Sequence, residues 1–158
     1  MTKSLTALFD CSEERLKEIV ADAVRGADDG ELYLETSESE ALLFDNGRLK
    51  TANYSTDQGF GLRAVAGEAS GYAHSSELSE AALLRASDAV SAVKAGYSGT
   101  LADAPPRTNR HLYGDANPIG SPSFEEKAKL LTEIDAYVRN ADPRVRQVTA
   151  SLAASWQH

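Results

Sequence analysis

The residue pair Asn46-Gly47 constrains the fold of this chain more than any other feature. A two-residue type I′ turn needs positive φ at both central positions, and Asn-Gly is among the pairs that meet this need most readily. Apolar and polar residues alternate on both sides of the pair, in a pattern that extends from Glu31 to His74. We therefore expect a β-hairpin inside an antiparallel meander of four or five short strands, with one face of the sheet covered.

Two helices are expected to flank this meander and to cover one side of it. The first contains residues 16–24, with Ser12 as its N-cap and Gly26 as its C-terminal stop. The second begins after Ser79. Its apolar side chains share one face: Leu83, Ala86, Val90 and Val93. The pattern predicts an α+β fold in which helices pack against one face of an antiparallel sheet.

The later part of the chain has a different character. A segment with four prolines, residues 96–122, lacks apolar periodicity and is typical of a connector. A capping box then begins a third helix, with Ser123 as N-cap and Glu126 three residues later. Its predicted buried stripe consists of four residues: Ala128, Leu131, Ile134 and Val138.

A β pattern follows this helix at residues 145–152. No partner strand follows it in the sequence, and folded domains avoid such open edges, so we expect these residues to be part of a longer protein. The predicted organisation is an N-terminal α+β domain at 1–98, a Pro/Gly-rich linker at 99–122 and the start of a second α+β, or middle, domain at 123–158.

Composition excludes several classes of protein. A net charge of −8 and a pI near 4.9 argue against nucleic-acid binding, which needs a basic surface. The single cysteine, Cys11, excludes an intramolecular disulfide and a cysteine zinc site. The sequence has neither an apolar run long enough to span a membrane nor a signal-peptide h-region. We therefore expect a cytoplasmic protein.

Side chains that carry chemistry are few and scattered. The three histidines, His74, His111 and His158, form no pair with metal-ligand spacing. Cys11 precedes a helix, where the dipole can lower a thiol pKa, but it lacks a recognisable histidine partner. The segment Gly59-Phe60-Gly61 lies inside a strand pattern and therefore does not match a dinucleotide-binding loop. The residues alone predict no catalytic or metal site, and a small hydrolase using Cys11 or His74 is the least favoured hypothesis.

Several separated motifs occur in order along the chain. Residues 57–68 have the sequence DQGFGLRAVAGE, and residues 142–152 have the sequence DPRVRQVTASL. Together with three further segments, 31–35, 45–50 and 71–73, they resemble the N-terminal part of the TldD/PmbA family in order and spacing, over most of the chain from Leu16 to Trp156. The motif at 142–152 resembles the TldD branch in particular.

The resemblance implies part of a cytosolic metallopeptidase that acts on unfolded or small peptides. In that family, TldD-like subunits carry an H-E-x-x-x-H zinc site in a later domain and pair with a TldE/PmbA-like subunit or with a second copy. An older family label is modulator of DNA gyrase. This sequence contains no H-E-x-x-x-H, so no catalytic or metal residue is carried over, and zinc is expected only in a catalytic domain outside these residues.

Two functional hypotheses follow. In the first, the chain is the substrate-gating and dimerisation portion of a TldD-like zinc metallopeptidase, and this portion is inactive by itself. Its candidate signature is Gln58, Gly59, Gly61 and Arg63. Glycines let a peptide backbone approach, and Arg63 could bond a carbonyl or acidic group; alternatively, the glycines relieve strand twist and Arg63 forms a surface ion pair. The second hypothesis is a non-catalytic interaction module, a regulator of DNA gyrase or of the toxin–antitoxin type.

Overall fold

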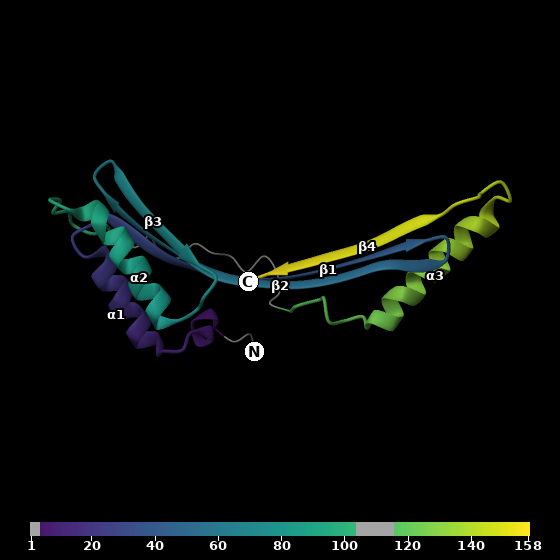
Figure 1. Cartoon of the computed structure of the whole chain (residues 1–158), viewed down its shortest axis with the longest axis horizontal. Coiled ribbons are helices and arrows are strands. Elements are labelled where there is room, and N and C mark those ends of the chain that lie inside the picture. Colours follow the sequence, from purple (N-terminus) through teal and green to yellow (C-terminus); the bar gives the residue numbers. More distant parts are fainter. Residues whose placement is uncertain (1–3, 104–115) are drawn as a thin grey trace. The chain divides into compact units, whose positions relative to one another are not determined.

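The computed structural model describes residues 4–103 and 116–158 (Figure 1). Contacts divide the chain into two compact units: Met1–Thr36 with Gln58–Asp115, and Ser37–Asp57 with Ala116–His158. Four strands form an antiparallel sheet in the order β3 (Ala69–Ser75), β2 (Arg48–Ala66), β1 (Asp29–Asp45) and β4 (Thr149–Gln157), with helices packed on it. The predicted α+β class is therefore confirmed.

The first unit is built around two serine-capped helices. Helix α1 spans Glu13–Val24 and α2 spans Glu80–Ser91. The Ser12 hydroxyl accepts a hydrogen bond from the Arg15 amide at 3.2 Å, and the Ser79 hydroxyl accepts one from the Ala82 amide at 3.1 Å. Both predicted N-caps are confirmed, and each satisfies a helix N–H that has no partner within the helix.

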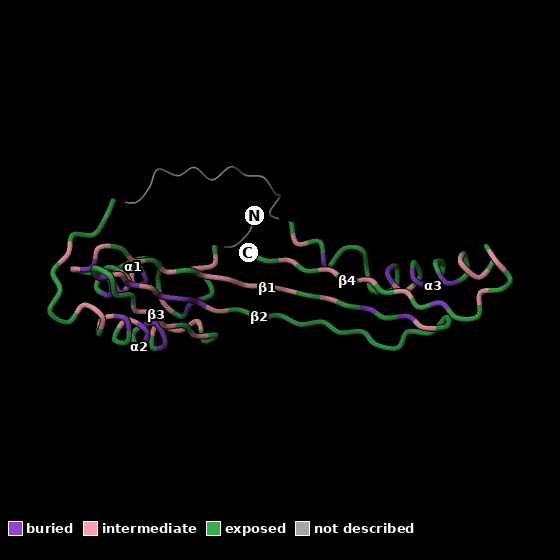
Figure 2. Tube along the Cα trace, turned by 90° about the horizontal axis from the view of Figure 1, so that it is seen from above, coloured by how far each residue is buried: buried purple, intermediate pink, exposed green. Residues whose placement is uncertain are grey.

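The core of the first unit lies between these helices and the sheet. Strand β3 (Ala69–Ser75) pairs with β2 (Arg48–Ala66) in a register from Phe60↔Ser75 to Ala66↔Ala69. Figure 2 shows buried residues gathered on α1, α2 and this part of β2. The largest fully buried side chains of the unit are Leu16, Leu62, Leu83 and Val90. Two short 3-10 turns complete the unit, at Leu5–Leu8 and Ala92–Lys94.

The second unit packs one helix on a sheet. Helix α3 spans Phe124–Ala141 and begins at Ser123 in the predicted capping box. Strand β4 (Thr149–Gln157) pairs with the second half of β1 (Asp29–Asp45). A small core joins helix and strands through Leu42, Phe44 and Leu131. Contacts therefore group residues 37–57 with the later segment, while the predicted boundaries 1–98, 99–122 and 123–158 stay a prediction.

The meander contains fewer and longer strands than the sequence predicts. Between Glu31 and His74 we expected four or five short strands, but the structure has three, of which β1 has 17 residues and β2 has 19. The alternation fades at Thr36–Glu40 and Tyr54–Gln58, where polar residues follow one another. Neither segment contains glycine or proline, so nothing breaks the extended backbone there.

The buried face of α3 also differs from the predicted stripe. Leu131 is buried as expected, but Ile134 is 39% exposed, and the other buried residues of the helix are Lys127 and Asp135. The physical reason is that both charged side chains find partners. Lys127 binds Glu40 of β1, and Asp135 binds Arg139 one turn further along α3. Lys127 and Asp135 thus share the buried face with Leu131, while Ala128 and Val138 of the predicted stripe are half-buried and Ile134 is the member that departs from it.

Strand β4 begins at Thr149, four residues later than predicted, and forms one edge of the sheet. Its register with β1 runs from Ser37↔Gln157 to Asp45↔Thr149. Within residues 4–103 and 116–158, no strand pairs with its outer side. In the same ranges, no helix combines the length and the apolar character that crossing a bilayer requires.

The β1–β2 turn is held against α3 by a charged network that predicts a pH dependence. Arg139 donates hydrogen bonds to both carboxylate oxygens of Asp135, at 2.8 and 3.2 Å, and to Asn46 Oδ1 at 2.7 Å. These bonds from Arg139 are the main reason why the pKa of Asp135 lies below its ordinary value of 3.8. Asp135 thus stabilises the fold fully above that value, and the contribution is lost as the pH falls through the lowered pKa.

We expect Asp135→Asn to lower the free energy of unfolding at neutral pH, with a difference from the wild type that shrinks below about pH 4. Urea unfolding at a series of pH values measures this difference. Glu133→Gln, on the exposed face of α3, is the control and should show a much smaller effect. An Asp135→Asn effect of equal size at all pH values would contradict the assignment.

Candidate functional site

The two strand glycines of the predicted signature lie in β2 of the first unit, each close against β3. A Cβ placed on Gly59 would lie 2.9 Å from the carbonyl oxygen of Ser75. A Cβ placed on Gly61 would lie 2.7 Å from the Tyr72 hydroxyl, so the tyrosine ring occupies the space above this glycine. The groups that a side chain would meet at both positions are therefore part of the chain itself, and Gln58 is the exposed residue that precedes the two glycines.

Arg63, the fourth residue of the signature, bridges two acidic side chains of β1. Its Nε donates to Glu31 at 2.9 Å and its Nη2 donates to Asp29 at 3.0 Å. The Arg63 side chain is 39% exposed, so the pair lies near the surface, where such pairs contribute little to stability. These contacts favour the structural alternative for Arg63 over direct binding of a peptide group.

These neighbours lead to a prediction for the glycines. Gly59→Ala should cost about 1 to 3 kcal/mol of unfolding free energy, because the Cβ meets backbone that is fixed by strand pairing. Gly61→Ala should cost less, because Tyr72 is 66% exposed and its ring can swing away. Thermal unfolding of both variants measures the difference. A larger cost at Gly61 than at Gly59 would show that other neighbours determine these positions.

The cysteine and histidines do not form a catalytic group in the described ranges. Partial burial raises the pKa of the Cys11 thiol, and the negative charges of Glu80 and Asp10 raise it further. The thiol is thus less reactive than an ordinary one, in agreement with the packing role predicted for it. His74 stacks on Tyr72 with ring centroids 5.7 Å apart, and His158 lies beside Trp156. His111 lies outside the described residues.

The same ranges contain no group of three His, Cys, Asp or Glu side chains that could hold a metal ion. Zinc in proteins is held by three or four such ligands. The described residues therefore do not fit a zinc ion, and no step of catalysis can be derived from them.

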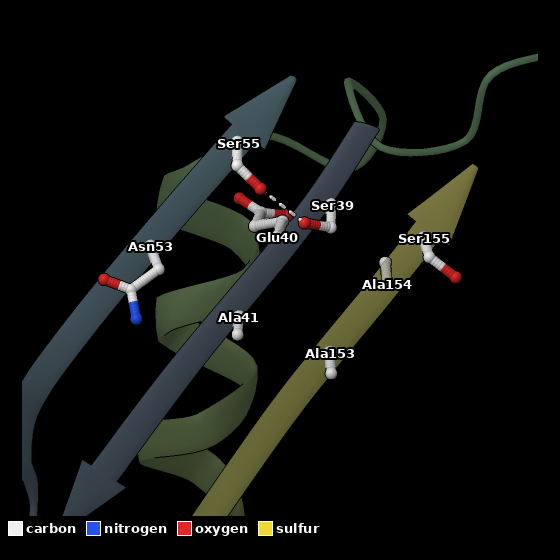
Figure 3. A pocket seen from close by; sticks show the side chains of 8 residues that line it. All are labelled: Ser39, Glu40, Ala41, Asn53, Ser55, Ala153, Ala154 and Ser155. Atoms are coloured by element: carbon white, nitrogen blue, oxygen red, sulfur yellow. Dashed lines mark hydrogen bonds between the residues drawn. The ribbon is translucent and has the colours of Figure 1, made fainter. Parts of the chain in front are cut away.

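An open hollow lies on the face of the second unit's sheet that α3 does not cover (Figure 3). Its floor consists of small uncharged side chains from three strands, and the charged residue at its border is Glu40. The Ser39 and Ser55 hydroxyls are hydrogen-bonded at 2.7 Å, and Asn53 lies next to Ser55 on β2 (Figure 3). The other lining residues are Ala41, Ala153, Ala154 and Ser155.

The residues of this hollow can bind a peptide backbone, but they cannot activate a nucleophile. Hydroxyl and amide groups can donate to and accept from an extended backbone, and small side chains leave room for it. No histidine lies among its lining residues to activate a serine, and the one lining carboxylate, Glu40, is paired with Lys127. This surface was not predicted from the sequence, because serine and alanine match no motif. The available signal was small residues at period two, Ser39-x-Ala41 and Ser151-x-Ala153-x-Ser155.

A second, polar hollow of the same unit surrounds the buried ion pair of α3. The Lys127 side chain is 6% exposed and the Glu40 side chain is 12% exposed. Lys127 also donates to the carbonyl oxygen of Ile119 at 2.5 Å, and Tyr54 donates to Glu38 at 2.8 Å. The lysine thus fixes the segment before α3 to strand β1, which makes this hollow a structural joint.

Comparison with known proteins identifies the family. Residues 30–95 match the family model for PmbA/TldA metallopeptidase domain 1. The metalloprotease TldD homolog of Buchnera aphidicola subsp. Acyrthosiphon pisum is 34% identical over 134 residues, which are 84% of this chain and 28% of that protein. The homolog of Haemophilus influenzae is 31% identical over 160 residues, 99% of this chain and 31% of that protein. The chain corresponds to the N-terminal part of the TldD/PmbA family, as predicted, and spans about a third of these relatives.

Solved structures support the fold. A candidate modulator of DNA gyrase from Bacteroides thetaiotaomicron superposes with a TM-score of 0.63 at 12% identity, covering 92% of this chain and 35% of that chain. A second candidate modulator, from Thermotoga maritima, gives a TM-score of 0.60 at 15% identity and covers 92% of this chain and 37% of that chain. At such identities the likeness concerns the fold alone.

Proposed function

We propose that this chain is the N-terminal substrate-gating and dimerisation portion of a TldD-like zinc metallopeptidase that acts on unfolded or small peptides in the cytoplasm. The matches to two TldD metalloproteases along most of the chain support the assignment. On this proposal, the H-E-x-x-x-H zinc site belongs to a part of the protein outside these residues. The chain by itself is then inactive, and its partner is a TldE/PmbA-like subunit or a second copy.

The observation that carries the gating role is the open hollow of small uncharged residues on the second unit. A flat sheet surface accepts an extended peptide, whose backbone can bond the Ser39, Asn53 and Ser55 side chains. A folded domain cannot present its backbone in this way, because its N–H and C=O groups are already paired. The signature Gln58, Gly59, Gly61 and Arg63 then has the supporting role of shaping the first unit.

The full-length protein tests this function. We expect it to cleave a linear, unstructured peptide, and we expect EDTA to stop and zinc to restore the cleavage. The matched control is the same peptide closed into a tight ring, which cannot extend and should be cleaved at least about tenfold more slowly. Equal rates for both peptides would overturn the gating role, and EDTA-insensitive cleavage would overturn the metallopeptidase assignment.

A second function is favoured by one comparison. The two solved structures compared above are described as candidate modulators of DNA gyrase, and this chain has no metal-binding group in the ranges described. The alternative is therefore a non-catalytic module that binds a protein, of the gyrase-regulator or toxin–antitoxin type. Calorimetric titration of the chain with purified DNA gyrase tests whether the chain is a gyrase regulator. Stoichiometric binding that EDTA leaves unchanged would favour this alternative.

A further inference from the structure

The segment that follows α2 in the first unit, residues 94–102, folds back onto the end of α1, and we call it the strap. At its start, the Lys94 ammonium donates hydrogen bonds to the carbonyl oxygens of Asp22 and Arg25, at 3.3 and 3.1 Å. These carbonyls lie at the C-terminal end of α1, where they lack partners within the helix and where a cation is favourable. The first residue of the strap is therefore fixed to α1.

The far end of the strap is held by Asp28, which uses its backbone and its side chain together. The Asp28 carbonyl accepts a hydrogen bond from the Ala102 amide at 2.7 Å, and the Asp28 amide donates to the Val65 carbonyl at 2.8 Å. The Asp28 carboxylate accepts from the Tyr97 hydroxyl and, at 2.8 Å, from the Gly67 amide in the β2–β3 turn. Asp28 thus joins the strap to β2 and to this turn.

The hydrogen bond between Tyr97 and Asp28 is charge-assisted. It is the main reason why the pKa of Asp28 lies below its ordinary value of 3.8, and it also raises the pKa of the Tyr97 hydroxyl above its ordinary value of 10. Near neutral pH the carboxylate is therefore ionised while the tyrosine keeps its proton. Hydrogen bonds to a charged acceptor are about twice as strong as neutral ones.

A glycine lets the strap lie this close to Asp28. A Cβ placed on Gly99 would overlap the Asp28 carboxylate and would lie 2.7 Å from a ring carbon of Tyr97. The Gly99 amide donates to the Gly26 carbonyl at 2.9 Å, just after the end of α1. The strap is therefore fitted to Asp28 by shape as well as by hydrogen bonds.

Polar contacts hold the strap, and apolar burial contributes little. None of residues 94–102 is buried, and the two large apolar side chains, Tyr97 and Leu101, are 40% and 47% exposed. Helix α2, which precedes the strap, instead places Leu83 and Val90 in the core. Segments with few buried apolar contacts open at a small cost in free energy while the core stays folded.

We propose that the strap opens and closes as one unit over the folded core of the first unit, with Asp28 as its latch. Loss of the Asp28 contacts removes the bonds to Tyr97 and Ala102 together, so the strap has a single point of release. Opening transfers residues 95–102 from the first unit to the connector that follows. Such a strap needs neither a peptide nor a partner subunit, so it goes beyond the proposed function.

Amide hydrogen exchange of the 158-residue chain, followed by NMR, tests the latch. We expect the Gly99 and Ala102 amides to show the same protection, and Asp28→Ala to speed exchange at both about tenfold or more, because hydrogen bonds to a charged group are lost. The amide of Ala86, a buried residue of α2, should keep its protection. Asp29→Ala is the matched control, because the Asp29 carboxylate pairs with β2 and not with the strap.

A second variant removes only the strap's own bond to the latch. Tyr97→Phe leaves the Asp28 carboxylate in place with its bond from the Gly67 amide. We expect faster exchange at Gly99 and Ala102, while the Gly67 amide keeps its protection. This variant separates opening of the strap from any damage that Asp28→Ala does to the β2–β3 turn.

Three results would overturn the proposal. Unchanged exchange at Gly99 and Ala102 in both variants would show that Asp28 is not the latch. Wild-type protection that differs between these two amides by more than about tenfold would show that the strap does not open as one unit. Loss of protection at Ala86 in step with the strap would assign the opening to unfolding of the whole first unit. Each of these results leaves the proposed role in peptide cleavage untouched.

Discussion

Replacing Lys127 with alanine is expected to lower the free energy of unfolding by about 3 to 5 kcal/mol, the usual cost of leaving a buried charge without its partner. The variant leaves Glu40 without its ammonium partner in a poorly solvated hollow and releases the Ile119 carbonyl. Urea unfolding followed by circular dichroism measures the loss. Lys129→Ala is the matched control, because this lysine of the same helix has a side chain 76% exposed and should cost under about 1 kcal/mol.

The double variant Lys127→Met/Glu40→Leu separates the contribution of charge pairing to stability from the contribution of packing. Buried ion pairs can often be replaced by apolar side chains of similar volume without loss, so the double variant should recover most of the stability that the single variant loses. If the double variant is as unstable as Lys127→Ala, the joint depends on the hydrogen bond to Ile119 and not on charge balance.

Replacing Leu83 with alanine is expected to cost about 2 to 5 kcal/mol, through lost transfer free energy and a residual cavity. Leu83 is fully buried between α2 and the sheet of the first unit. Its neighbour Leu84 is the matched control, since it is 41% exposed on the same helix and its change to alanine should cost well under half as much. Similar losses for both leucines would contradict the packing of α2 on the sheet.

Much of the fold could be predicted because its signals are local. Ser12, Ser79 and Ser123 each cap a helix where the sequence predicts one, and Asn46 and Gly47 both have positive φ in the predicted hairpin turn. These features depend on a few adjacent residues, whose side chains satisfy backbone groups nearby.

The features that could not be predicted depend on residues far apart in the sequence. The burial of Lys127 requires Glu40, 87 residues away, so helix periodicity alone pointed to Ile134 instead. The length of β1 and β2 results from pairing of polar segments that show no clear alternation. In both features, tertiary contacts outweigh the preference of the local sequence pattern.

The candidate site was predicted only in part. Gly59 and Gly61 were recognised as strand glycines, but only the structure shows that Tyr72 and Ser75 are the neighbours that limit side chains there. The hollow around Ser39 and Ser55 combines three strands through small residues, whose alternation at period two matches no known motif. The family resemblance contributed the metallopeptidase assignment, which no residue of this chain reveals by its own chemistry.

On the proposed function, these 158 residues take part in peptide cleavage without performing it. The direct measurement is hydrolysis of denatured casein by the purified chain, with and without added zinc and after EDTA treatment. The account predicts no hydrolysis above a buffer control under any of these conditions. Hydrolysis by the purified chain that EDTA stops and zinc restores would contradict it.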